Sequence, residues 1–102
     1  MLSSVQKNRI IDVLLDLGIT PKLKGFNYIV DAVEYMLNYK DCNIMEVYDY
    51  LSDKYKVNNS ERNIRHAFSK CDENSLVYKQ WFGHAKTNSE RLTTLALKIG
   101  RM

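Results

Sequence analysis

The sequence predicts an all-α fold: a single domain of six short helices around one core. Two observations indicate this class. Apolar residues return every three or four positions along almost the whole chain, and no stretch shows the sustained alternation of a β-strand. The length and composition agree, because 102 residues with 45% hydrophobic and 26% charged side chains provide one core but not two.

The first two predicted helices lie before residue 41. Gly18 is placed to end the first helix, and Ser3 and Gln6 have the spacing of a capping box at its start. The second helix is expected to end near Lys40. The apolar stripes of the two helices are Ile10, Val13, Leu14 and Leu17, and Phe26, Ile29, Val30, Val33 and Leu37.

The third and fourth predicted helices are joined by a short polar connection, residues 56–59. Asn43 has the position of an N-cap for the third helix, with Glu46 as its reciprocal partner. The fourth helix is expected over residues 60–71. The two stripes are Ile44, Val47, Tyr48, Leu51 and Tyr55, and Ile64, Ala67, Phe68 and Cys71. Two short helices with a tight polar turn have the layout of a helix-turn-helix.

Two further helices are predicted near the C-terminus. A short one is expected at Leu76, Val77, Trp81 and Phe82, stopped by Gly83. The last helix follows residues 87–90, which have the Ser/Thr-x-x-Glu spacing of a capping box. Its apolar stripe is Leu92, Leu95, Ala96 and Ile99.

Charge is distributed unevenly between the two halves of the chain. Residues 1–53 carry five Lys/Arg and eight Asp/Glu, a net charge of −3, whereas residues 54–102 carry ten and four, a net charge of +6. A basic half beside an acidic one indicates a face that meets a polyanion such as nucleic acid. The alternative is a solvated surface whose asymmetry is accidental.

Several other classes of protein are disfavoured. No apolar run approaches the ~18 residues that span a bilayer, and the N-terminus lacks a signal-peptide pattern, so we expect a cytosolic protein. Cys42 and Cys71 are expected to be reduced and buried, with a disulfide as the alternative. His66 and His84 share no ligand spacing with these cysteines, so no metal or cofactor is expected. No phosphate-binding glycine loop or nucleophile motif occurs, and we expect no catalysis.

The helix predicted at residues 60–71 has a polar face that suits DNA. At 100° per residue, the side chains opposite the core stripe are those of Arg62, His66 and Ser69. Arg65 lies on the flank of this face. An arginine can make a bidentate contact to guanine, worth roughly 1–3 kcal/mol of discrimination. Glu61 is expected either to accept a hydrogen bond from cytosine or to pair with Arg65.

Residues around this face are predicted to hold the phosphate backbone. The polar residues that precede the helix would meet phosphates together with the free backbone amides of its first turn. Flanking lysines would supply the salt-sensitive, sequence-independent part of the affinity. The complete predicted set of DNA contacts is Lys54, Lys56, Asn58, Asn59, Ser60, Glu61, Arg62, Arg65, His66, Ser69, Lys70 and Lys86.

Three stretches of the chain agree with one family. Residues 60–67 read SERNIRHA, residues 17–26 read LGITPKLKGF and residues 87–90 read TNSE. In this order they resemble the recognition helix, the first turn and the start of the last helix of one effector domain. That domain is the C-terminal DNA-binding domain of the sporulation master response regulator of endospore-forming bacteria.

The resemblance implies a six-helix fold with a helix-turn-helix at the third and fourth helices. It also implies sequence-specific binding to double-stranded DNA, transcription regulation and a cytoplasmic, nucleoid-associated location. Partners implied by the family are a second copy bound in tandem on DNA and the RNA polymerase sigma factor. The family's DNA-facing residues fall on Glu61, Arg62, Arg65 and His66.

The chain departs from the family in three places. Met1 is followed almost at once by the effector helices, so we expect a stand-alone version without a receiver domain, with an excised segment as the alternative. The turn before the recognition helix is shorter and lacks an arginine near Asn59 or Ser60, so base preference is expected to differ. The segment between Phe82 and Thr87 is also shorter, close to the sigma-factor contact, so promoter occupancy is expected rather than activation.

Two other functions remain open. A small basic protein also suits an architectural or recombination accessory factor of a mobile element. A protein–protein antagonist of the full-length sporulation regulator is the other alternative, although it leaves the basic half of the chain without a role.

Overall fold

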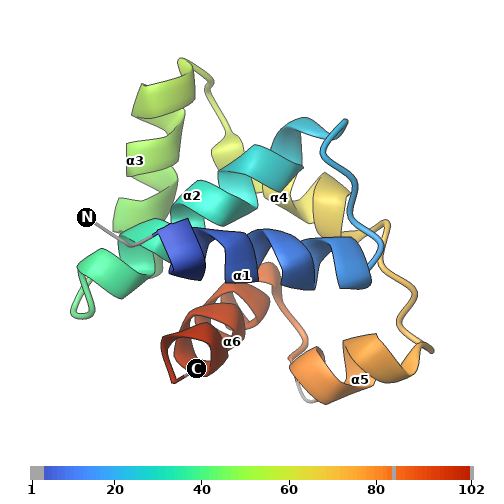
Figure 1. Cartoon of the computed structure of the whole chain (residues 1–102). Coiled ribbons are helices and arrows are strands. Elements are labelled where there is room, and N and C mark those ends of the chain that lie inside the picture. Colours follow the sequence, from blue (N-terminus) through green and yellow to red (C-terminus); the bar gives the residue numbers. More distant parts are fainter. Residues whose placement is uncertain (1–3, 84, 102) are drawn as a thin grey trace.

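Residues 4–83 and 85–101 are described by a computed structural model, in which they form six helices and no strand (Figure 1). The helices are α1 (Ser4–Asp16), α2 (Lys24–Asn38), α3 (Ile44–Tyr55), α4 (Ser60–Phe68), α5 (Leu76–Phe82) and α6 (Asn88–Gly100). The predicted all-α class is confirmed. No helix in these described ranges is long and apolar enough to cross a membrane.

The core is one cluster of buried apolar side chains to which every helix contributes. α2 is the central helix, because it packs against α1, α3, α4 and α6. Fully buried representatives from five helices are Leu14, Ile29, Leu51, Ile64 and Leu95. All the stripe residues predicted for the last helix are buried, as are those predicted for the first.

Gly25 permits a close crossing of α2 and α4. A Cβ added to Gly25 would lie 2.2 Å from the backbone oxygen of Asn63 and 2.6 Å from the Cβ of Ala67. Both distances are far inside van der Waals contact, and the first involves rigid helix backbone. A residue without a side chain is therefore what allows α4 to rest directly on the start of α2.

Gly18 ends α1 as predicted. It has φ of +90°, the left-handed conformation that glycine adopts without steric cost. The amide of Ile19 then donates to the carbonyl of Leu14, which satisfies one of the last acceptors of the helix. Ser3, the predicted N-cap at the other end, lies outside the described residues.

The connection between α3 and α4 is held by side-chain hydrogen bonds. α3 begins at the predicted cap, since the side chain of Asn43 accepts from the amide of Glu46 at 2.9 Å. It ends at Tyr55, and its C-cap Lys56 is left-handed with φ of 55°. Asn59 caps α4 by accepting from the amide of Arg62 at 3.1 Å. These caps fix where α3 starts and ends and where α4 starts.

The predicted end of the fourth helix was wrong. Residues 69–71 are turns, and α4 ends at Phe68. The amides of Lys70 and Cys71 donate to carbonyls three residues back, at 3.1 Å each, so the α-helical pattern is lost there. The hydroxyl of Ser69 also donates to the carbonyl of His66, at 2.5 Å.

The inward face of α5 was predicted only in part. Phe82 is buried as expected, and Val77 and Trp81 pack against the core. Leu76, however, is 76% exposed, and Tyr78 is buried instead. The helix is only seven residues long, and Tyr78 and Phe82 lie one turn apart on its inner side. Ser75 caps it by accepting from the amide of Tyr78 at 3.1 Å.

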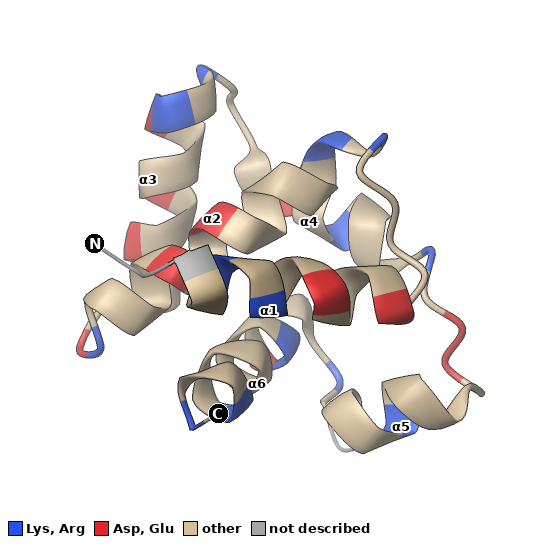
Figure 2. Cartoon of the chain, in the orientation of Figure 1, with Lys and Arg blue, Asp and Glu red and all other residues tan. Residues whose placement is uncertain are grey.

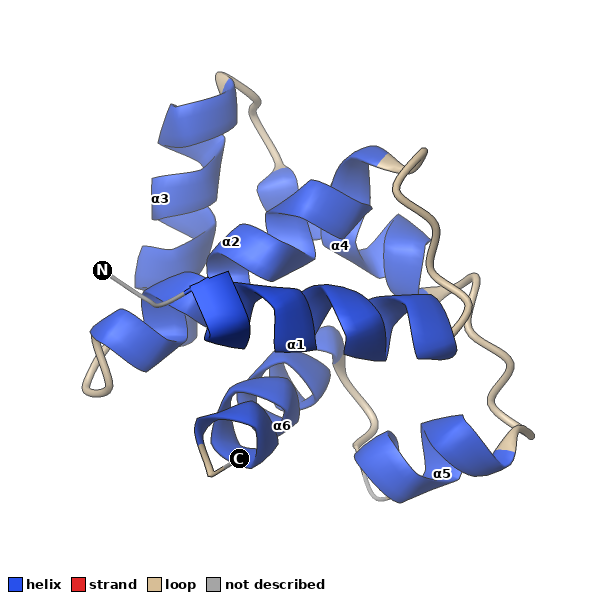
Figure 3. Ribbon diagram, in the orientation of Figure 1, coloured by secondary structure: helices blue, strands red, loops and turns tan. Residues whose placement is uncertain are grey.

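Charge follows the two halves of the chain in space. Figure 2 shows most Asp and Glu on α1, α2 and α3, and Lys and Arg around α4, α6 and several connections. Figure 3 shows that the loops joining α4, α5 and α6 gather at one side of the molecule. Basic side chains therefore lie around α4, although Lys79 lies on α5 and Arg101 follows the end of α6.

Candidate nucleic-acid interface

α4 presents a basic outer face over a buried inner face. Arg62, Arg65 and His66 are exposed. On the inner side Ile64 and Ala67 are fully buried. This division is the one that the helical periodicity predicts, because residues two positions from the core stripe point away from it. The core holds the helix rigidly while its polar side chains stay in solvent.

Glu61 pairs with Arg65 on this face. A carboxylate oxygen of Glu61 lies 3.8 Å from Nη1 of Arg65, one helical turn away. The arginine side chain is 61% exposed and the glutamate 32%. A pair at this distance and exposure contributes little to stability, so the guanidinium is free to exchange its partner. Of the two roles predicted for Glu61, pairing with Arg65 is present in the free protein.

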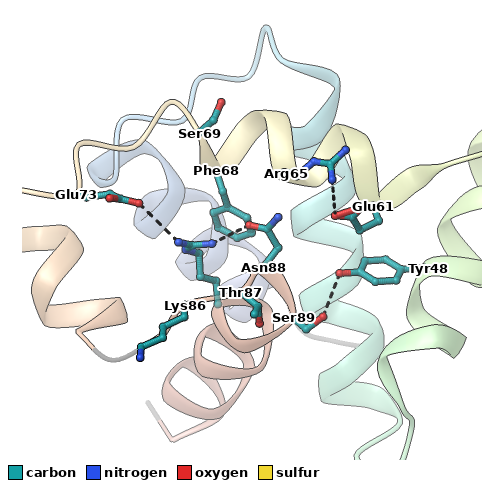
Figure 4. A pocket seen from close by; sticks show the side chains of 11 residues that line it. Tyr48, Glu61, Arg65, Phe68, Ser69, Glu73, Lys86, Thr87, Asn88 and Ser89 are labelled. Atoms are coloured by element: carbon teal, nitrogen blue, oxygen red, sulfur yellow. Dashed lines mark hydrogen bonds and ion pairs between the residues drawn. The ribbon is translucent and has the colours of Figure 1, made fainter.

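An open hollow of ≈ 540 Å³ lies beside α4, between α3 and the start of α6 (Figure 4). Three cationic side chains and two carboxylates are among the residues that line it. The full lining is Tyr48, Glu61, Arg65, Phe68, Ser69, Glu73, Lys86, Thr87, Asn88, Ser89 and Arg91. The hollow therefore joins predicted contact residues from α4 to Lys86, which is distant in sequence.

The start of α6 forms one wall of the hollow. Thr87 accepts from the amide of Glu90 at 3.1 Å and donates to its carboxylate at 3.2 Å. This is the cap predicted from the sequence. Lys86, directly before the cap, is exposed. The hydroxyls of Tyr48 and Ser89 lie 3.4 Å apart and link α3 to the same wall (Figure 4).

Arg91 is the cationic lining residue that sequence reasoning missed. Its Nε donates to the Tyr78 hydroxyl and its Nη1 to the Asn88 side chain, each at 2.9 Å. Its side chain is only 14% exposed. The available signal was its spacing, because Arg91 lies four residues before the stripe residue Leu95 and so continues the inward face of α6.

Ser60 corrects one predicted contact. Its side chain is buried, with the residue 1% exposed. The hydroxyl donates to the carbonyl of Tyr48 at 2.9 Å and accepts from the hydroxyl of Ser52 at 3.0 Å. Ser60 therefore fastens α4 to α3, and its side chain is not available to a phosphate.

Lys54 lies on a different part of the surface from the hollow. Its ammonium lies 3.0 Å from the carboxylate of Asp31 on α2, near the rings of Tyr50 and Tyr55. The hydrogen bond that Lys54 donates to Asp31 raises the pKa of Lys54. Burial and then Asp31, which accepts from the Tyr55 hydroxyl, raise the pKa of Tyr55. Lys54 thus braces α3 against α2 instead of lining the hollow.

The other predicted contacts remain on the surface. Lys56 and Asp53 form an exposed pair at 3.9 Å, which contributes little. Asn58, Ser69 and Lys70 are also exposed. Asn59 uses its side-chain oxygen to cap α4. Asn58 and Lys70 therefore lie at opposite ends of α4, on either side of its basic face.

The two cysteines are free thiols in different surroundings. Cys71 is 9% exposed, and burial raises its pKa to about 11. Cys42 is half-buried rather than buried, and burial raises its pKa as well. His84, which entered the prediction against zinc, lies outside the described residues. Within the described ranges, no three His, Cys, Asp or Glu side chains gather where they could hold a metal ion.

Comparison with known proteins gives one family. The family model described as "Sporulation initiation factor Spo0A C terminal" matches residues 10–99. No curated protein and no solved structure matches the chain. The matched residues span nearly the whole chain, including α4 and every residue of the hollow. The chain therefore belongs to the family of the C-terminal domain of the sporulation initiation factor, a DNA-binding domain of transcription regulators.

Proposed function

We propose that the chain binds double-stranded DNA sequence-specifically, with α3 and α4 as a helix-turn-helix and α4 in the major groove. The observation that carries this proposal is the outer face of α4, where Arg62, Arg65 and His66 are exposed above a fully buried inner face. In a helix-turn-helix the second helix enters the major groove with its N-terminal residues against the base edges.

The chemistry of this face divides into two kinds of contact. Arg62 and Arg65 are assigned to guanine, because a guanidinium can bond O6 and N7 of one base together. The exposed lysines are assigned to phosphates, which position the protein without reading the sequence. Lys70 directly follows α4. Lys86 lies across the hollow from α4. His66 and Glu61 complete the base-facing set.

The protein acts on transcription by occupying promoter DNA. The connection between α5 and α6 comprises only residues 83–87. Such a short connection offers little surface for a further partner such as polymerase. DNA occupancy requires only the interface around α4, whereas activation requires a second contact surface.

Selection of bound sequences from random duplex DNA tests the proposal. A consensus should emerge, and the affinity for it should exceed that for a scrambled duplex at physiological salt by roughly a thousandfold. Affinity should fall as salt rises, with a log–log slope of about −0.9 for each phosphate contacted. Recovery of no consensus, or binding that does not respond to salt, would contradict the proposed function.

A further inference from the structure

The side chain of Arg91 joins segments that are separate in sequence. Its guanidinium hydrogen-bonds Tyr78 on α5 and Asn88 at the start of α6. Nη2 lies 3.7 Å from the carboxylate of Glu73 in the connection after α4. Its Cζ lies 5.9 Å from the ring centre of Phe68 at the end of α4. One half-buried guanidinium therefore contacts α4, α5, α6 and the connection between α4 and α5.

One of these contacts closes a loop that contains Lys86. Arg91 donates to Tyr78 on α5 at 2.9 Å, and Lys86 lies between the two in the sequence. The second bond, to Asn88 one turn earlier on α6, also 2.9 Å long, orients the guanidinium. The contact with Phe68 ties the base of this loop to the end of α4. Figure 4 shows Lys86 and Arg65 on opposite sides of the hollow. Arg91 thus links the loop that carries Lys86 to the end of α4.

An arginine is needed for this set of contacts. The planar guanidinium directs Nε and Nη1 to two acceptors in fixed directions, while its face covers an aromatic ring. Arg91 also lies 5.9 Å from the ring centre of Tyr78. A lysine keeps the positive charge but has a single nitrogen, so it cannot bridge Tyr78 and Asn88 in the same geometry.

We propose that Arg91 is a positioning residue of the DNA interface, which holds Lys86 at the distance from α4 that lets both meet one DNA duplex. This inference rests on the proposed DNA binding and adds a residue that does not itself need to touch DNA. Arg91 acts through the loop that it closes, and Lys86 makes the phosphate contact. Loss of the guanidinium should therefore remove the contribution of Lys86 even when the charge is kept.

A double-mutant cycle between Arg91 and Lys86 tests the inference. Lys86→Ala should lower DNA affinity by roughly fivefold to tenfold and reduce the steepness of the salt slope by about 0.9. Arg91→Lys should produce a similar loss and the same change in slope, although the net charge is unchanged. The double variant should be no weaker than the weaker single variant. Arg101→Lys, at the far end of α6, is the matched control and should alter neither quantity.

The salt slope separates positioning from a merely structural role. If Arg91→Lys binds less tightly but keeps the wild-type slope, or if the two losses multiply, the inference is wrong. Tyr78→Phe removes one acceptor of the guanidinium and keeps the ring, so it tests the same loop should Arg91→Lys fail to fold. It should be non-additive with Lys86→Ala, and additive losses would again overturn the inference. Wild-type protein without salt-dependent DNA binding would instead refute the proposed function.

Discussion

At the scale of single residues, the candidate interface pairs two arginines with carboxylates at long range. Glu61 lies 3.8 Å from the exposed Arg65, and Glu73 lies 3.7 Å from Arg91, whose side chain is 14% exposed. Glu73 is 72% exposed and Glu61 is 32% exposed. Each carboxylate carries a negative charge that DNA phosphates would repel. The two glutamates should therefore oppose sequence-independent binding, while Glu61 is also assigned to base discrimination.

Glu61→Gln should bind scrambled duplex more tightly, by roughly twofold to threefold at low salt, because a negative charge beside the phosphates is removed. Its preference for the selected site should fall, since the carboxylate is assigned to a base. Asp49→Asn, which makes the same charge change at an exposed position on α3, is the matched control. Fluorescence anisotropy with both duplexes measures these affinities. An equal gain for the two variants would show that Glu61 has no local role.

Cys71 should make stability fall at alkaline pH. Burial raises its pKa to about 11 in the folded protein, from an ordinary value near 9 in the unfolded chain. Between these values the unfolded chain loses the proton while the folded protein keeps it, so the free energy of unfolding falls as pH rises. From pH 8 to pH 10 wild type should lose about 1 kcal/mol more than Cys71→Ala. Urea unfolding measures the free energy of unfolding of both proteins at the two pH values. Equal losses in wild type and in Cys71→Ala would contradict the raised pKa of a buried Cys71 thiol.

At the scale of helices, the crossing of α2 and α4 sets the position of the proposed recognition helix, because no side chain at Gly25 separates the two helices. Gly25→Ala should destabilise the fold by about 2–3 kcal/mol and weaken DNA binding, since the new Cβ must push α4 off α2. Gly100→Ala is the matched control. Its Cβ meets only the movable Cδ2 of Leu37, at 3.0 Å, so stability should change by less than about 1 kcal/mol. Urea unfolding compares the free energies of unfolding of the two variants. Similar values would contradict the close crossing of α2 and α4 at Gly25.

Helix positions were predictable where local chemistry decides them. α3 begins after Asn43 and α6 after Thr87 because each side chain caps its own helix. The end of α4 was not predictable, because Cys71 is buried as the periodicity requires although the backbone has already left the helix. The burial of Tyr78 in α5 was missed for another reason. In a helix of seven residues, contacts with Arg91 and the core outweigh a short apolar pattern.

The site was predictable in its exposed part and not in its buried part. Arg62, Arg65 and His66 lie on the outer face that the 100° spacing of a helix gives them. Ser60 and Lys54 depend on partners from other helices, which a single sequence does not display. The same is true of Arg91. Its bond to Tyr78 appears only when α5 and α6 are placed together.

At the scale of the whole molecule, the fold sorts charge. Acidic side chains lie mainly on α1, α2 and α3, and basic side chains surround α4 and α6 (Figure 2). The net charge of +3 is modest, so attraction to DNA depends on this arrangement more than on the total. The uneven charge would orient the protein so that α4 faces the approaching DNA. The central claim is therefore that α4 reads the sequence while the surrounding lysines supply general affinity.

The ratio of affinities for the selected site and for a scrambled duplex tests this claim most directly. Arg62→Ala and Arg65→Ala should each lower the ratio by roughly tenfold or more, because a bidentate guanine contact is worth about 1–3 kcal/mol of discrimination. Arg101→Ala removes the same charge just after the C-terminal end of α6, and it should leave the ratio of the two affinities unchanged. If both α4 variants keep the wild-type ratio, α4 is not the recognition helix.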